Sequence, residues 1–157
     1  MDKAIIRKHL ISLLQWEDAH VNFDTVINGI PEELRGVQAR GLPYSPWQLL
    51  EHLRTIQHDI LDFCQNPNYK EPTWPDDYWP QFVAPRSLDE WENSIKLYRS
   101  DRKALLEMAA NPEVDLTAPI PHGSGQNYFR ELLLVADHNS YHIGQLVIVR
   151  RLLGIWK

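Results

Sequence analysis

The spacing of apolar residues constrains the fold of this chain more than any other feature. Along four long stretches, apolar side chains recur at three- or four-residue steps, the period of one helix face, and strand alternation is weak. The pattern predicts helices over about residues 1–28, 45–66, 87–110 and 128–153. Four such helices bury their apolar faces by packing side by side, so we predict an all-α fold, a four-helix bundle. The stripe of the first helix consists of Ile6, Leu10, Leu13, Trp16, His20, Phe23 and Ile27.

Capping signals mark two of the helix starts. Ser45-Pro46-Trp47-Gln48 and Ser87-Leu88-Asp89-Glu90 each combine a capping serine with a side chain three positions later that can reach back to it. Gly29 and Pro31 are expected to end the first helix, and Gly154 the last.

The segment between the second and third predicted helices, residues 67–86, is rich in proline and aromatic residues. Its prolines forbid a regular helix, while Trp74, Tyr78, Trp79 and Phe82 are too apolar for a free linker. We predict a long Pro/Trp-rich loop that is ordered and packs on the bundle. A connection of about 20 residues can join antiparallel neighbours or span the bundle and join parallel helices, so both helix orders stay open.

Length and charge restrict the class of protein. The chain has 157 residues, and we predict one domain over residues 1–157, which needs no structural metal to fold. A formal charge of −5 and scattered basic residues argue against a nucleic-acid binder. The longest apolar stretch, Ile143–Val149, is too short to span a membrane. With a single cysteine, Cys64, and no basic-then-apolar leader, we expect a cytoplasmic protein.

Among seven histidines, His138 and His142 carry the strongest chemical signal. They lie four positions apart, which places both imidazoles on one face of a helix, one turn apart. Val135 and Val149 share that mostly apolar face, so the pair is expected to point inward. Buried imidazoles need partners for their ring nitrogens, and one metal ion can serve both.

Two histidines compete for the place of a third ligand. His52 lies beside Leu53 and Ile56 on the inner edge of the second helix and is the leading candidate. His20, in the stripe of the first helix, is the rival. A three-histidine site would leave coordination positions open to water or substrate, as catalytic zinc sites do. The spacing places the others on the surface or in loops: His9, His58 and His122.

Three segments resemble the DinB-like (DinB/YfiT) family of metalloenzymes. Ser45-Pro46-Trp47-Gln48-Leu49-Leu50-Glu51-His52 is similar to the family's second-helix signature, and His138-Asn139-Ser140-Tyr141-His142-Ile143-Gly144-Gln145-Leu146 to its last-helix signature. Arg150-Arg151-Leu152-Leu153-Gly154 resembles the ending that follows. The resemblance covers essentially the whole chain and implies a four-helix bundle, often a homodimer. By position it implies that His52, His138 and His142 hold a divalent metal such as zinc or nickel.

The resemblance implies a metal site more directly than a reaction. Members of the family include transferases that use bacillithiol, mycothiol or glutathione, as well as isomerases and hydrolases, and many have no assigned reaction. Our leading hypothesis is a metal-dependent enzyme that transfers a low-molecular-weight thiol to an electrophilic small molecule. The alternatives are a hydrolase with a metal-bound hydroxide and a non-catalytic metal- or ligand-binding module. Zinc or nickel is the expected metal, with manganese or iron as alternatives.

The remaining candidate residues carry weaker signals. Tyr141 and Gln145 lie near the histidine pair but are typical packing or hydrogen-bonding residues, so neither is assigned a catalytic role. Cys64 is expected to be a buried apolar residue rather than a nucleophile. A hydrolase would need a general base, and four carboxylates, most of them expected on solvated faces, are candidates by sequence proximity: Glu51, Asp59, Glu131 and Asp137.

Overall fold

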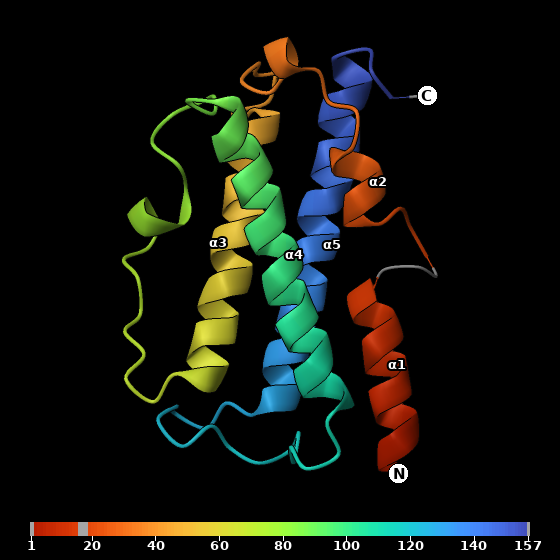
Figure 1. Cartoon of the computed structure of the whole chain (residues 1–157), viewed down its shortest axis with the longest axis vertical. Coiled ribbons are helices and arrows are strands. Elements are labelled where there is room, and N and C mark those ends of the chain that lie inside the picture. The colour runs from red at the N-terminus through yellow and green to blue at the C-terminus, as the bar shows by residue number, and fades with distance from the viewer. Residues whose placement is uncertain (1, 16–18, 157) are drawn as a thin grey trace.

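The computed structural model describes residues 2–15 and 19–156, and over these residues it is all-helical (Figure 1). The five α-helices are α1 (Lys3–Gln15), α2 (Phe23–Ile27), α3 (Pro46–Gln65), α4 (Leu88–Ala110) and α5 (Tyr128–Leu152). Two short 3₁₀ turns, η1 (Glu32–Leu34) and η2 (Asp76–Tyr78), interrupt the connections. Within the described ranges no strand is formed, which confirms the predicted all-α bundle.

The long helices α1, α3, α4 and α5 form the bundle. Helices α1 and α3 each contact both α4 and α5, so α1 and α3 lie on opposite sides of it (Figure 1). Helices α3 and α4 run in the same direction, because the chain after α3 climbs back along the whole length of the bundle before α4 begins (Figure 1). Of the two helix orders left open by the sequence, the long loop therefore joins parallel helices.

The predicted first helix over residues 1–28 is wrong as a single element, since α1 ends at Gln15 and α2 begins at Phe23. The physical reason is a new N-cap: the Asn22 side chain accepts a hydrogen bond from the Thr25 backbone N–H at 2.8 Å. Tertiary contacts then fix α2, whose Phe23 ring stacks on the Tyr98 ring of α4 at 3.8 Å. Trp16, part of the predicted stripe, lies outside the described residues.

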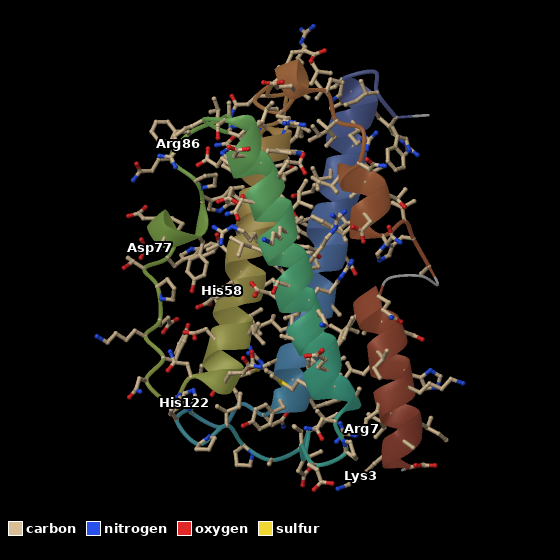
Figure 2. The ribbon with its side chains drawn as sticks, viewed as in Figure 1. Lys3, Arg7, His58, Asp77, Arg86 and His122 are labelled. Carbon is tan, nitrogen blue, oxygen red and sulfur yellow. The ribbon has the colours of Figure 1, made fainter. Side chains whose placement is uncertain are left out.

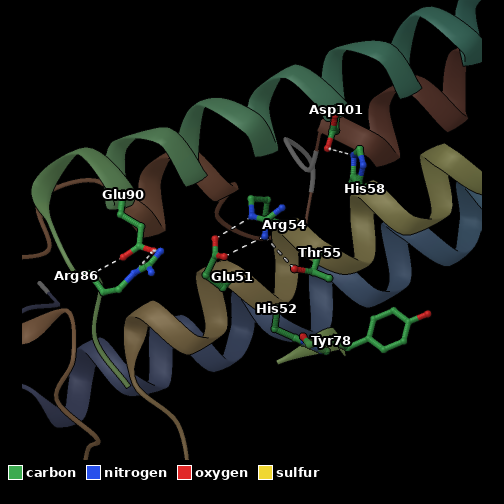
Figure 3. Close-up of polar contacts among 9 residues, drawn as sticks. All are labelled: Glu51, His52, Arg54, Thr55, His58, Tyr78, Arg86, Glu90 and Asp101. Carbon is green, nitrogen blue, oxygen red and sulfur yellow. Dashed lines mark hydrogen bonds and ion pairs between the residues drawn. The ribbon is translucent and has the colours of Figure 1, made fainter. Parts of the chain in front are cut away.

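The starts of α3 and α4 follow the capping signals. Ser45 accepts from the Gln48 N–H while the Gln48 side chain accepts from the Ser45 N–H, so the capping box is complete. Ser87 caps α4 through the Glu90 N–H, but the Glu90 carboxylate accepts from the Arg86 N–H and pairs with the Arg86 guanidinium (Figure 3). These caps fix the register of the two helices and hence the faces that they bury.

The core consists of two apolar clusters separated by a polar layer. The upper cluster joins α2 to the first halves of α3 and α4 and to the second half of α5, and includes Leu53, Tyr98 and Ile143. The lower cluster joins α1 to the remaining halves and includes Ile60 and Ala136. Between them, Gln57 donates to the Tyr98 carbonyl at 2.7 Å and accepts from the Asn139 amide at 3.0 Å. Gln57 and Asn139 are fully buried and link α3 to α4 and α5.

No helix among the described residues is long and apolar enough to cross a membrane.

Candidate metal centre

Three histidines from two helices meet in the bundle beside the amide layer. His52 lies on α3, and His138 and His142 lie on successive turns of α5. One ring nitrogen from each lies within 4.8 Å of the others, and the Nε2 atoms of His52 and His138 are 3.2 Å apart. Two nitrogens bound to one tetrahedral zinc ion are separated by about 3.3 Å, so this spacing suits shared coordination.

The packing of α3 against α5 places these side chains. His52 is 2% exposed and His142 7%, while His138 is partly exposed. The rings of His138 and His142 are 4.5 Å apart between centroids, as expected for positions one helical turn apart. The His52 ring is 5.0 Å from that of His138 and 4.6 Å from that of His142. The inward orientation predicted for the pair on the last helix is thus present.

Hydrogen bonds set the tautomers of two of the rings. His52 Nδ1 donates to the backbone carbonyl of Tyr78 at 2.8 Å (Figure 3), and His142 Nδ1 donates to the Gln145 side-chain oxygen at 2.7 Å. Because an oxygen acceptor requires the proton on Nδ1, the Nε2 lone pair of each ring is left as a ligand. Outer partners of this kind orient the histidines of metal sites.

His138 differs from the other two rings. Its Nε2 faces His52, while its buried Nδ1 has no hydrogen-bond partner among the described residues. Burial, reinforced by the neighbouring His142 and His52, lowers the pKa of His138 to about 3. Burial also lowers the pKa of His142 to about 4, and it lowers that of His52.

All three imidazoles are therefore neutral at pH 7, which is the form that coordinates a metal. Three neutral imidazole nitrogens in one cluster fit a divalent ion such as zinc or nickel.

The loop over residues 66–87 covers the cluster. The Trp79 ring stacks on the His52 ring at 3.9 Å with an interplanar angle of 7°. Together with the Tyr78 carbonyl, it holds the His52 ring in place. The proline and aromatic content predicted an ordered loop, but composition carries no signal for which residue would reach a histidine.

The other histidines lie outside the cluster. His20, the rival third ligand, is exposed and contacts the Val21 carbonyl and the Ser140 hydroxyl at 2.8 and 3.2 Å. His58 pairs with Asp101 at 3.1 Å (Figure 3), and His122 contacts the Phe63 carbonyl at 2.8 Å. Both are at the surface, as Figure 2 shows, and His9 is exposed as well.

Of the four candidate general bases, Asp59 shares a groove with one of the clustered histidines. It accepts hydrogen bonds from the Tyr69 and Tyr78 hydroxyls at 2.8 and 3.0 Å and lines a groove that reaches His138. Burial raises the pKa of Asp59, against the lowering effect of the two tyrosines.

The other three carboxylates are engaged elsewhere or face solvent. Glu51 pairs with Arg54 at 2.8 Å, and the buried Glu131 pairs with Arg130 at 2.7 Å. Asp137 is exposed.

Three further residues behave as the sequence suggested. Cys64 is buried, and burial raises the pKa of its thiol to about 12, so it remains protonated. Gln145 is a hydrogen-bonding residue, to His142, rather than a reacting group. Tyr141 is exposed and packs edge-on against the His142 ring at 4.9 Å.

A comparison with protein families agrees with this geometry. The model of the DinB superfamily matches residues 15–146. The chain belongs to the DinB superfamily. The matched part of this DinB-superfamily chain runs from the last residue of α1 through most of α5 and contains all three clustered histidines. No curated protein matches the chain significantly.

Proposed function

We propose that the protein binds one divalent metal ion, zinc or nickel in first place, through His52, His138 and His142. The observation that carries this proposal is the convergence of three neutral imidazoles, two of which, His52 and His142, have their outer nitrogens held by the chain. Manganese is less suited to an all-imidazole donor set because it favours oxygen ligands, and iron(II) binds a given nitrogen site more weakly than nickel does.

The proposed reaction is the transfer of a low-molecular-weight thiol to an electrophilic small molecule. A bound metal would supply a Lewis acid that lowers the pKa of a substrate thiol. The nucleophilic sulfur would come from the substrate, since the chain's one cysteine is buried with a thiol pKa of about 12. The chain's own residues hold the histidines, with the Tyr78 carbonyl and Gln145 as hydrogen-bond acceptors and Trp79 shielding His52 from water.

A second candidate reaction is hydrolysis, and one observation favours it. Asp59 shares a groove with His138, and its carboxylate is held by two tyrosine hydroxyls. A positioned carboxylate beside the metal centre could accept a proton from an attacking water.

We also propose that the protein forms a homodimer through the outward face of α5. Tyr141, Ile148 and Leu152 are exposed on α5, at spacings of seven and four residues that place them on one helix face. Sedimentation velocity should show a dimer that Ile148→Glu dissociates. A monomer at all concentrations tested would contradict this.

The experiment that tests the metal site is elemental analysis of the intact protein. We expect about one metal ion per chain, as isolated or after incubation with zinc or nickel. Less than about 0.1 ion per chain after incubation with zinc, nickel, manganese and iron would overturn the proposal.

Reaction classes are separated by substrate panels. If the transferase proposal is correct, thiols with epoxide or halide acceptors should show metal-dependent turnover. If the hydrolase proposal is correct, ester and amide substrates should show it. Bound metal without turnover in either panel would favour a non-catalytic binding module.

A further inference from the structure

A groove of about 350 Å³ opens beside the histidine cluster, between α3, α5 and the loop over residues 66–87. This volume suits a small molecule. Its one contact with the cluster is His138, so a ligand in the groove would lie next to the proposed metal centre. The lining residues are Ile56, Asp59, Ile60, Glu71, Trp74, Tyr78, Leu134 and His138.

The walls of the groove are apolar and aromatic. Ile56, Ile60 and Leu134 form the helical side, and Trp74 lies on the loop side. Trp74 is 67% exposed, although the centroid of its ring lies 5.5 Å from that of the Tyr78 ring. An exposed indole beside aliphatic side chains offers a surface for a flat apolar group or for a cation over its ring face.

The charges of the groove have one sign. Asp59 and Glu71 line it, and no lysine or arginine does. The Tyr69 and Tyr78 hydroxyls fix the position of the Asp59 carboxylate.

A neighbouring depression shares Asp59 and Glu71, and its one guanidinium, that of Arg130, donates to Glu131 at 2.7 Å. In the metal-free protein, a bound anion would therefore lose water next to two carboxylates without gaining a cationic partner.

We propose that this groove binds the small-molecule substrate of the centre as a cation, with an apolar, preferably aromatic body against Trp74 and a protonated amine beside Asp59 and Glu71. The inference rests on the proposed function for the reaction, but the binding itself does not depend on the metal. This proposal assigns the groove to the electrophilic substrate. Bacillithiol, mycothiol and glutathione are larger than the small molecules that suit the groove, and glutathione also carries carboxylates.

The test compares two probes of similar size and opposite charge, 2-phenylethylamine and 3-phenylpropionate. Isothermal titration calorimetry at pH 7 and low ionic strength should give about tenfold tighter binding of the amine than of the acid by the metal-free protein, and the amine should also bind the zinc-loaded protein. Added salt should weaken binding of the amine, because both carboxylates are partly open to solvent.

Variants locate the binding site. Glu71→Gln should lower the affinity for the amine about three- to fivefold, and Trp74→Ala should lower it by a similar factor. Glu92→Gln, on exposed α4 surface that does not line the groove, makes the same charge change and should have no effect. Both Glu71 and Trp74 are exposed, so these variants should fold.

The outcomes separate this inference from the metal proposal. Tighter binding of the acid, no binding of the amine, or an unchanged amine affinity in Glu71→Gln would overturn the assignment of the groove. Amine binding without metal uptake would overturn the proposed function and leave the groove assignment standing.

Discussion

Two buried polar groups lie side by side at the interface of α3 and α5, and they are built differently. In the amide pair, Gln57 and Asn139 bond to each other and to the Tyr98 carbonyl, so three of their polar groups are satisfied within the chain. In the histidine cluster, the Nδ1 protons of His52 and His142 are held, but the Nε2 lone pairs remain as acceptors at the centre. The hydrogen bonds of the amide pair link α3 to α4 and α5, although the buried Asn139 Oδ1 has no hydrogen-bond partner among the described residues. The converging lone pairs of the histidine cluster call instead for a cation from outside.

The largest expected effect is loss of metal from the histidine variants. His52→Ala, His138→Ala and His142→Ala should each reduce zinc content from about one ion per chain to nearly none, because two imidazoles bind zinc far more weakly than three. Helical content, measured by circular dichroism, should be retained. His20→Ala is the matched control and should keep its metal. If His20→Ala loses the metal and His52→Ala keeps it, the third ligand has been assigned to the wrong helix.

Acid should affect the histidine cluster and not the amide pair. Histidines of the unfolded chain have a pKa near 6.5, whereas burial lowers the pKa of His138 to about 3 and of His142 to about 4 in the folded, metal-free protein. The unfolded chain therefore binds more protons between these values, so the stability present above pH 6.5 is lost as the pH falls toward 4.

This loss has an upper limit of about 1.4 kcal/mol per pH unit for each histidine. Urea denaturation at several pH values, after the metal has been removed with a chelator, measures this loss of stability. His138→Leu should flatten the pH dependence, and Gln57→Leu should leave its slope unchanged. Equal slopes for wild type and His138→Leu would contradict the buried, neutral state of this ring.

Removal of the amide pair should cost stability without loss of metal. Gln57→Leu removes the side-chain donor to the Tyr98 carbonyl and leaves the Asn139 amide N–H without a partner in the core, which destabilises the folded state by about 1–3 kcal/mol. Chemical denaturation measures the change, and elemental analysis should still find about one zinc ion per chain. Loss of metal in this variant at temperatures where it remains folded would mean that the two polar groups form one unit.

The smallest expected effect concerns the residue that orients His142. Gln145→Ala removes the acceptor of the Nδ1 proton, and zinc affinity should fall about tenfold, as is typical for outer partners of metal ligands. A competition titration with a chromophoric chelator measures this change. Gln65→Ala, at the exposed end of α3, is the control. An unchanged zinc affinity in Gln145→Ala would show that packing alone orients the ring.

Much of the fold could be predicted from local signals. The periodic apolar stripes and the serine caps at Ser45 and Ser87 place α3 and α4, and the same periodicity places α5. The break between α1 and α2 was missed because residues 1–28 keep a helical apolar spacing, while the decisive signal was the capping preference of Asn22. The order of the helices depends on how the loop over residues 66–87 packs, which the spacing of residues leaves open.

The candidate site was likewise predicted only in part. Spacing within one helix brought His138 and His142 together, because i and i+4 share a face in any α-helix. His52 was favoured over His20 by its place on the inner edge of the second helix, and the family resemblance implied the same residue; in the structure His52 faces α5 and His20 is exposed. The Tyr78 carbonyl and the Trp79 ring were not predicted, because backbone acceptors and loop aromatics carry no sequence signature for the residue that they contact.

The sequence by itself determined that this chain is an all-α bundle with a pair of histidines on one inward helix face. These properties depend on contacts between residues close in the chain, through hydrogen bonds, caps and the helical period. The tertiary structure decided which distant residues complete the centre: His52 from α3, its hydrogen-bond acceptor on the loop, and the acidic groove beside His138. Such neighbours are set by the packing of whole helices, whose geometry depends on all the side chains between them rather than on any one motif.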